Sequence, residues 1–93
     1  MKVNDITKAK ELIAQSEAKR IARWEGIVAV SRSDLKTANR EVKFCKRMVY
    51  ESSNPDAWLE YKRFWLKRRA ELKKSLREET LYLSQLKKKM EVA

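Results

Sequence analysis

The sequence predicts an all-α fold, an antiparallel hairpin of two long helices. Apolar residues recur in steps of three and four along both halves of the chain, which keeps one stripe of each helix facing a partner helix. A run of turn-forming residues, Ser52–Asp56, separates the two halves. The 93 residues include one Gly and one Pro, and 43% are apolar and 39% charged. So few helix breakers argue for long helices and against a sheet.

The first helix is expected over residues 5–52. Asn4 or Asp5 can cap its exposed backbone N–H groups. This arm is the longer of the two, so its first residues overhang, with Ile6, Ala9 and Ile13 as their apolar face. The apolar stripe that follows consists of Ile21, Trp24, Val28, Ser31, Leu35, Ala38, Val42, Cys45 and Val49.

Two features leave the continuity of the first helix open. Gly26 lies inside it, and the run Ser31–Asp34 contains a capping-box pattern. Either the helix is continuous through Gly26–Ser33, or it kinks or breaks there and the chain forms three helices. The apolar period continues from Val28 to Leu35, which favours a continuous helix.

A turn is expected at residues 53–55, followed by the second helix at residues 56–91. Ser53 with Asp56 three residues later fits a capping box, whereas Asn54 before Pro55 fits a cap with proline at the first helical position. Three charged residues interrupt the stripe of the second helix, which consists of Trp58, Lys62, Trp65, Arg69, Leu72, Leu76, Glu79, Leu83, Leu86 and Met90.

Folding back at this turn pairs positions whose numbers sum to about 107. Val49 then meets Trp58 and Val42 meets Trp65, so large residues oppose small ones, as interdigitated packing requires. We expect residues 1–93 to form a single domain. A hairpin of this size buries little surface, so self-association or a tight partner is expected.

The clearest functional indication is the basic charge: 23 Lys and Arg against 13 Asp and Glu, a formal net charge of +10. No Asp or Glu has a Lys or Arg four residues later, the favourable spacing for a helical ion pair. These cations either form a solvated surface or, as we prefer, face nucleic-acid phosphates or an acidic protein. The expected binding residues are Arg32, Lys36, Arg40, Lys43, Arg47, Arg63, Lys67, Lys74 and Arg77.

A second set of apolar residues lies off the two stripes. Apolar residues exposed in helical register usually mark association, here either a homodimeric four-helix bundle or a site for a larger protein. Trp58, Tyr61 and Trp65 fall within a narrow arc on the stripe and are expected in the core. The expected interface residues are Ile27, Val30, Phe44, Met48, Leu59, Phe64, Leu66, Leu81 and Tyr82.

The residue types exclude much catalytic chemistry. The chain has no His and one Cys, so it cannot build Ser-His or Cys-His nucleophile pairs, nor a zinc site made of His or of Cys alone. We therefore expect a protein that is not an enzyme and that needs no metal or cofactor. Cys45 lies on the stripe and is interpreted as a packing residue.

We expect a soluble protein of the reducing cytoplasm. No apolar run is long enough to span a membrane, and Met1–Asp5 lacks the apolar segment of a signal peptide. A single cysteine suits a reducing compartment. Binding to a membrane surface is the least favoured alternative, because the best apolar stripes face each other.

The predicted function is non-catalytic docking on nucleic-acid phosphates, or on a complex that handles nucleic acid, without base specificity. Nothing in the sequence suggests a helix that reads bases in a groove or a sheet that stacks them. The alternative is a protein-binding adaptor or inhibitor that engages an acidic surface of a larger machine, with the off-stripe apolar residues as anchors.

Overall fold

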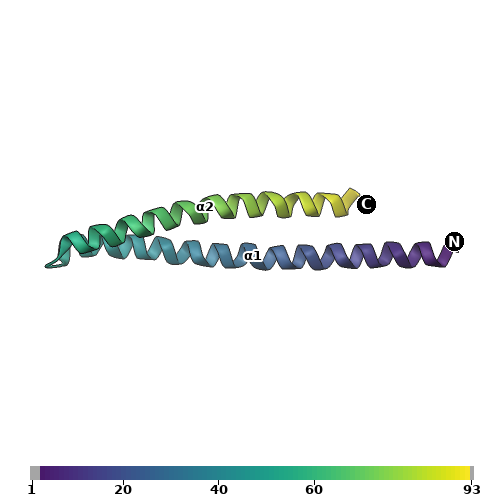
Figure 1. Cartoon of the computed structure of the whole chain (residues 1–93), viewed down its shortest axis with the longest axis horizontal. Helices are drawn as coiled ribbons and strands as arrows, with labels where there is room; N and C mark the ends of the chain where they lie inside the picture. Colours follow the sequence, from purple (N-terminus) through teal and green to yellow (C-terminus); the bar gives the residue numbers. More distant parts are fainter. Residues whose placement is uncertain (1–2, 93) are drawn as a thin grey trace.

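The computed structural model describes residues 3–92 and contains two helices, α1 (Val3–Glu51) and α2 (Pro55–Val92). They lie side by side and antiparallel, with the turn at one end of the rod and both ends of the described chain at the other (Figure 1). The rod measures 77 × 15 × 14 Å. The predicted all-α helical hairpin is therefore confirmed.

The core is a single seam between α1 and α2. Every residue of the two predicted apolar stripes is buried or half-buried, which confirms the heptad assignment. The seam includes the three charged positions, Lys62, Arg69 and Glu79, and all three residues are half-buried. The most deeply buried side chains are Val28, Ser31, Ala38, Val42, Cys45, Leu72 and Leu83.

Two polar atoms in this seam lack a hydrogen-bond partner: Trp65 Nε1 and Glu79 Oε2. A buried polar group without a partner costs about 1–3 kcal/mol. Charged and indole side chains at seam positions thus weaken the hairpin relative to an all-leucine seam.

Aromatic and charged contacts fix the register of the two helices. The rings of Trp24 and Tyr82 meet edge-on with centroids 4.8 Å apart, and Lys87 Nζ lies 3.4 Å from Glu25 Oε1. Trp24 and Tyr82 are one residue from the predicted pairing in which position numbers sum to about 107.

The alternative of a broken first helix is wrong: α1 continues through Gly26 to Glu51 without interruption. Gly26 has no positive φ, and a Cβ added there would meet nothing within 4 Å. The capping pattern of Ser31–Asp34 is not used as a helix start. Instead, Ser33 accepts a hydrogen bond on its carbonyl oxygen from Thr37 Oγ1 at 3.3 Å.

The start of α2 at Pro55, directly after Asn54, matches the position of the second predicted cap, but the Asn54 side chain makes no hydrogen bond to any described residue. The Ser52 N–H still donates to the Met48 carbonyl at 2.9 Å, and the Asn54 N–H donates to Ser52 Oγ at 3.1 Å. Ser53 makes no side-chain hydrogen bond within the described chain, so the capping box does not form.

The longer arm leaves an overhang at the open end of the rod, as Figure 1 shows. Ile6, Leu12 and Ile13 are exposed there. Met90 of α2 closes the seam against this region and lines a hollow with Ile13, of about 560 Å³. Neither helix contains, within residues 3–92, an apolar segment able to cross a membrane.

Candidate nucleic-acid interface

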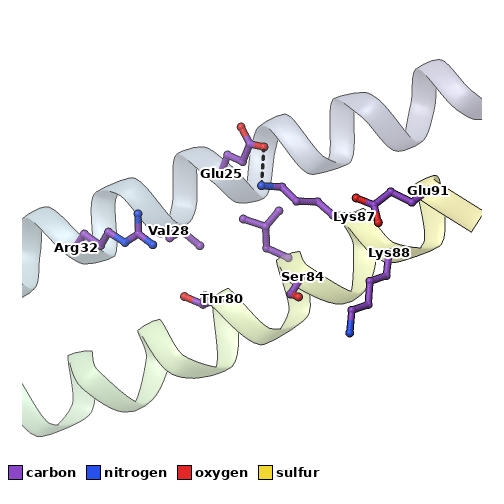
Figure 2. A pocket seen from close by; sticks show the side chains of 9 residues that line it. Glu25, Val28, Arg32, Thr80, Ser84, Lys87, Lys88 and Glu91 are labelled. Atoms are coloured by element: carbon purple, nitrogen blue, oxygen red, sulfur yellow. Dashed lines mark ion pairs between the residues drawn. The ribbon is translucent and has the colours of Figure 1, made fainter.

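Contacts across the seam show which residues lie on each side of the hairpin. The Glu25–Lys87 ion pair marks one side (Figure 2), and the contact of Trp24 with Tyr82 marks the other. Residues two apart on a helix are separated by about 200°. Thr80, which lines a hollow beside Glu25 and Lys87, and Tyr82 therefore lie on opposite sides of α2.

The side that carries the Glu25–Lys87 pair is strongly basic. Arg32 lines the hollow beside that pair, and Lys73 and Arg77 line the next hollow along the seam. Other exposed Lys and Arg residues lie on the same side if they are one helical turn, or a multiple of seven residues, from these three. Within residues 32–46 and 63–77 this set, the basic flank, is Arg32, Lys36, Lys43, Lys46, Arg63, Lys73 and Arg77.

The density of charge on the basic flank is close to that of a nucleic-acid strand. Residues 32–46 of α1 and 63–77 of α2 lie opposite each other, and each segment is about 21 Å long at 1.5 Å per residue. Seven cations over that length give one positive charge per about 3 Å. One strand of duplex DNA carries one negative charge per about 3.4 Å of axis.

Local ion pairs do not neutralise the basic flank. The ion pairs among residues with described side chains are Arg47–Glu51, Arg68–Glu71 and Lys87–Glu25, and none includes a member of the flank. Within its 21 Å stretch, the heptad positions of the flank hold no Asp or Glu. The acids Glu25 and Glu91 lie at its open-end border, beside Lys87 and Lys88 (Figure 2).

All nine basic residues expected from the sequence are exposed, but they do not form one surface. Five belong to the basic flank. The other four lie on the outer faces of the helices, which point away from the seam in opposite directions: Arg40, Arg47, Lys67 and Lys74. Arg47 is paired with Glu51 at 3.4 Å, and Arg40 Nη2 donates to Thr37 Oγ1 at 3.4 Å.

The sequence prediction missed two members of the basic flank, Lys46 and Lys73. On a single helix these residues lie at the edge of the seam rather than in the basic stripe. In an antiparallel pair, the positions after the seam residues of both helices face the same side. Pairing the stripes by heptad position would have found both lysines.

The opposite side of the hairpin is rich in aromatic and aliphatic residues. The ring of Phe44 meets that of Trp58 at 5.5 Å between centroids, and Trp58 meets Tyr61 at 5.9 Å. Glu41, Phe44 and Tyr61 line a hollow of about 330 Å³ there. By heptad position this side, the aromatic flank, consists of Ile27, Val30, Phe44, Met48, Tyr61, Phe64 and Tyr82.

Six of the nine expected interface residues lie on the aromatic flank. Leu59 and Leu66 are half-buried at the edge of the basic flank, and Leu81 lies on the outer face of α2. The structure therefore does not gather all nine into one surface.

The expectation that Tyr61 belongs to the core is wrong, because its side chain is 48% exposed. Tyr61 and Lys62 lie three and four residues after Trp58, and either spacing is compatible with a helical stripe. The heptad of α2 places Lys62 in the seam instead, where it is half-buried. Tyr61 is turned onto the aromatic flank, where its ring contacts those of Phe64 and Trp65.

The seam offers no reactive thiol. Burial raises the pKa of the Cys45 thiol above its ordinary value, the Glu41 carboxylate raises it further, and Lys62 opposes this in part. The thiol is therefore protonated at neutral pH and acts as an apolar packing group. Among the residues that the structure describes, no group of three or more Cys, Asp or Glu could hold a metal ion.

Comparison with protein-family models, with curated proteins and with solved structures found no match to this chain. The basic flank and the aromatic flank therefore have to be interpreted from their own chemistry.

Proposed function

We propose that the protein is a non-catalytic hairpin that binds the phosphate backbone of nucleic acid through its basic flank, without base specificity. The observation that carries this proposal is the unpaired positive charge of that flank, at about one charge per 3 Å. The buried, unreactive thiol of Cys45 suits the reducing cytoplasm, where nucleic acids are abundant.

The shape of the hairpin favours contact with phosphates over reading of bases. Lysine and arginine side chains lie on both helices of the flank, and half-buried Leu59 and Leu66 lie beside them. Tyr50, seven residues after Lys43, is exposed on this side at the turn end, outside the stretch of about 21 Å. The rings that contact one another belong to the seam or the aromatic flank. Binding without base stacking is sequence-tolerant and governed by counterion release.

The test is a salt series of binding to a fluorescent duplex of 24 base pairs, read by anisotropy. If all seven cations contact phosphate, log K falls with log salt with a slope of up to about −6. The variant Lys36→Gln, Lys43→Gln, Lys73→Gln removes three flank charges. We expect its slope to be closer to zero by about 2.7 and its affinity at low salt to fall on the order of 10²-fold.

A matched control removes three charges from the open end of α1: Lys8→Gln, Lys10→Gln, Lys19→Gln. All three residues are exposed, and Gln and Lys have similar helix propensities. Both triple variants have the same net charge, so an equal loss of affinity would show attraction to overall charge rather than binding by the flank. Absence of binding to duplex or single strand at low salt would reject the proposal.

The alternative of an acidic protein partner is favoured by one observation, the exposed aromatic flank, which offers anchors that a phosphate backbone does not use. Affinity purification from a lysate treated with nuclease separates the two. A partner that remains bound at moderate salt after nuclease, and that the flank triple variant fails to retain, supports the adaptor or inhibitor function.

A further inference from the structure

The hairpin exposes far more surface than a compact protein of its mass. Its accessible surface is 7761 Å². A compact monomer of 11.1 kDa is expected to expose about 5,700 Å². The excess of about 2,000 Å² exceeds the roughly 800 Å² that each partner buries in a stable protein interface. The single seam thus leaves surface available for a second layer.

The exposed apolar part of this surface is concentrated on the aromatic flank. Phe44, Tyr61 and Phe64 are each between 44% and 58% exposed, although they touch other rings. Farther toward the open end, Val30 and Tyr82 are also exposed on this flank. Apolar residues therefore extend along most of the side that faces away from the basic flank.

Charges at the border of the aromatic flank are separated along the rod. By heptad position the open end carries the cations Arg20, Arg23 and Lys89, and all three are exposed. The middle of the flank carries acids, Asp34, Glu41, Glu71 and Glu78. Arg68 lies among these acids but is paired with Glu71 at 3.9 Å. The flank therefore has a basic open end, an acidic middle and an aromatic turn end.

We propose that the aromatic flank binds a second copy of this chain, with the two rods packed head to tail. A two-fold axis across the flank places the basic open end of each copy over the acidic middle of the other. The aromatic cluster around Phe44 and Phe64 then faces the open end of α1 in the partner copy, where Ile13 is exposed. The product is a four-helix bundle whose two basic flanks face outward on opposite sides.

This arrangement also explains how chains with a net charge of +10 associate. Cations of the basic flank lie on the far side of each hairpin from the interface, so the bundle separates them by its own thickness. That separation exceeds the Debye length of about 8 Å at physiological salt.

The experiment is sedimentation equilibrium of the full chain at about 5–200 µM and physiological salt, because assembly depends on protomer concentration. The proposal requires a mass of twice 11.1 kDa at the upper concentrations. The double variant Val30→Lys, Phe64→Lys puts like charges into the two-fold interface, at residues 61% and 58% exposed. We expect its dimer dissociation constant to rise at least about tenfold.

The control Leu12→Lys, Leu81→Lys adds the same charge on the outer faces, at residues 65% and 61% exposed. It is expected to dimerise like the parent chain. A monomeric parent chain at 200 µM, equal weakening by both double variants, or weakening by the control alone would each overturn the proposal. Circular dichroism of both variants verifies that the helices remain intact.

A charge exchange tests the head-to-tail arrangement without altering any apolar residue. Arg20→Glu with Arg23→Glu is expected to weaken the dimer about tenfold, because acids would then face acids. Adding Glu41→Arg and Glu71→Arg to the same chain restores opposite charges and is expected to recover the dimer. Failure of the quadruple variant to dimerise would reject the head-to-tail arrangement.

Discussion

The turn half and the open half of the seam differ in how completely they bury their residues, although one heptad period is common to both. In the turn half, Ala38 and Cys45 are fully buried beneath α2. In the open half, the best-buried residues of the seam, Val28, Ser31 and Leu83, each keep between 4% and 9% of their surface exposed. The small residues of the turn half are covered more completely by the side chains of the opposite helix. Burial in a structure of two helices therefore depends on side-chain size as much as on hydrophobicity.

The largest expected effect comes from placing a charge in the seam, and one such variant tests each half. Val42→Asp puts a carboxylate at a fully buried position, and we expect a loss of about 3–5 kcal/mol, enough to unfold a small hairpin. Leu86→Asp, at a half-buried position of the open half, is expected to cost less than half as much. Thermal unfolding followed by circular dichroism measures both, and equal losses would contradict the difference between the halves.

A smaller change strengthens the open half. Gly26 is helical, exposed and free of close contacts, so Gly26→Ala is expected to raise the free energy of unfolding by about 1 kcal/mol through helix propensity alone. The reciprocal variant Ala22→Gly, also exposed on α1, should lower it by a similar amount. A destabilised Gly26→Ala protein would show that the glycine makes a close approach that the structure lacks.

The ion pair that joins the helices in the open half is expected to contribute less still. Glu25 and Lys87 are half exposed, and exposed pairs of this kind contribute about 0.2–1 kcal/mol. A double-mutant cycle of Glu25→Gln and Lys87→Gln measures the coupling, which should disappear at about 1 M salt, where the Debye length is about 3 Å. A coupling that is unchanged in high salt would mean that the interaction is not electrostatic.

The smallest effect belongs to Cys45 in the turn half and is confined to alkaline pH. Its pKa is raised in the folded state, mainly by burial, so the unfolded chain loses the thiol proton at lower pH than the folded one. The contribution to stability is complete below the ordinary pKa near 9.0 and decreases as pH rises toward the folded pKa. As pH rises above the ordinary pKa, the Cys45→Ala variant should lose stability less steeply than the parent chain. Parallel curves of unfolding free energy against pH would contradict this.

Much of the fold followed from the sequence because the heptad period determines both burial and register. The positions of Val42 and Trp65, of Leu35 and Leu72, and the continuity of α1 across Gly26 all derive from spacing alone. Tyr61 could not be placed in this way, since Tyr61 and Lys62 are equally compatible with a helical stripe. Only the heptad of the whole helix decides between them.

The candidate site was harder to predict than the fold, because it is assembled from two helices. Arg40 and Lys43 are neighbours on the surface of α1, yet Lys43 belongs to the basic flank while Arg40 lies on the outer face. The flank of the hairpin on which a residue lies depends on the direction from which the second helix packs. The sequence of one helix contains no information on that direction, whereas the two heptads considered together do.

The basic flank carries more net positive charge than the aromatic flank, and this affects encounters in solution. The charge distribution gives the rod a transverse dipole across a width of about 15 Å. A polyanion that approaches from any direction exerts a torque on this dipole and rotates the basic side toward itself before contact. Productive collisions then outnumber those expected from random orientation, and adding salt removes that advantage first from the association rate.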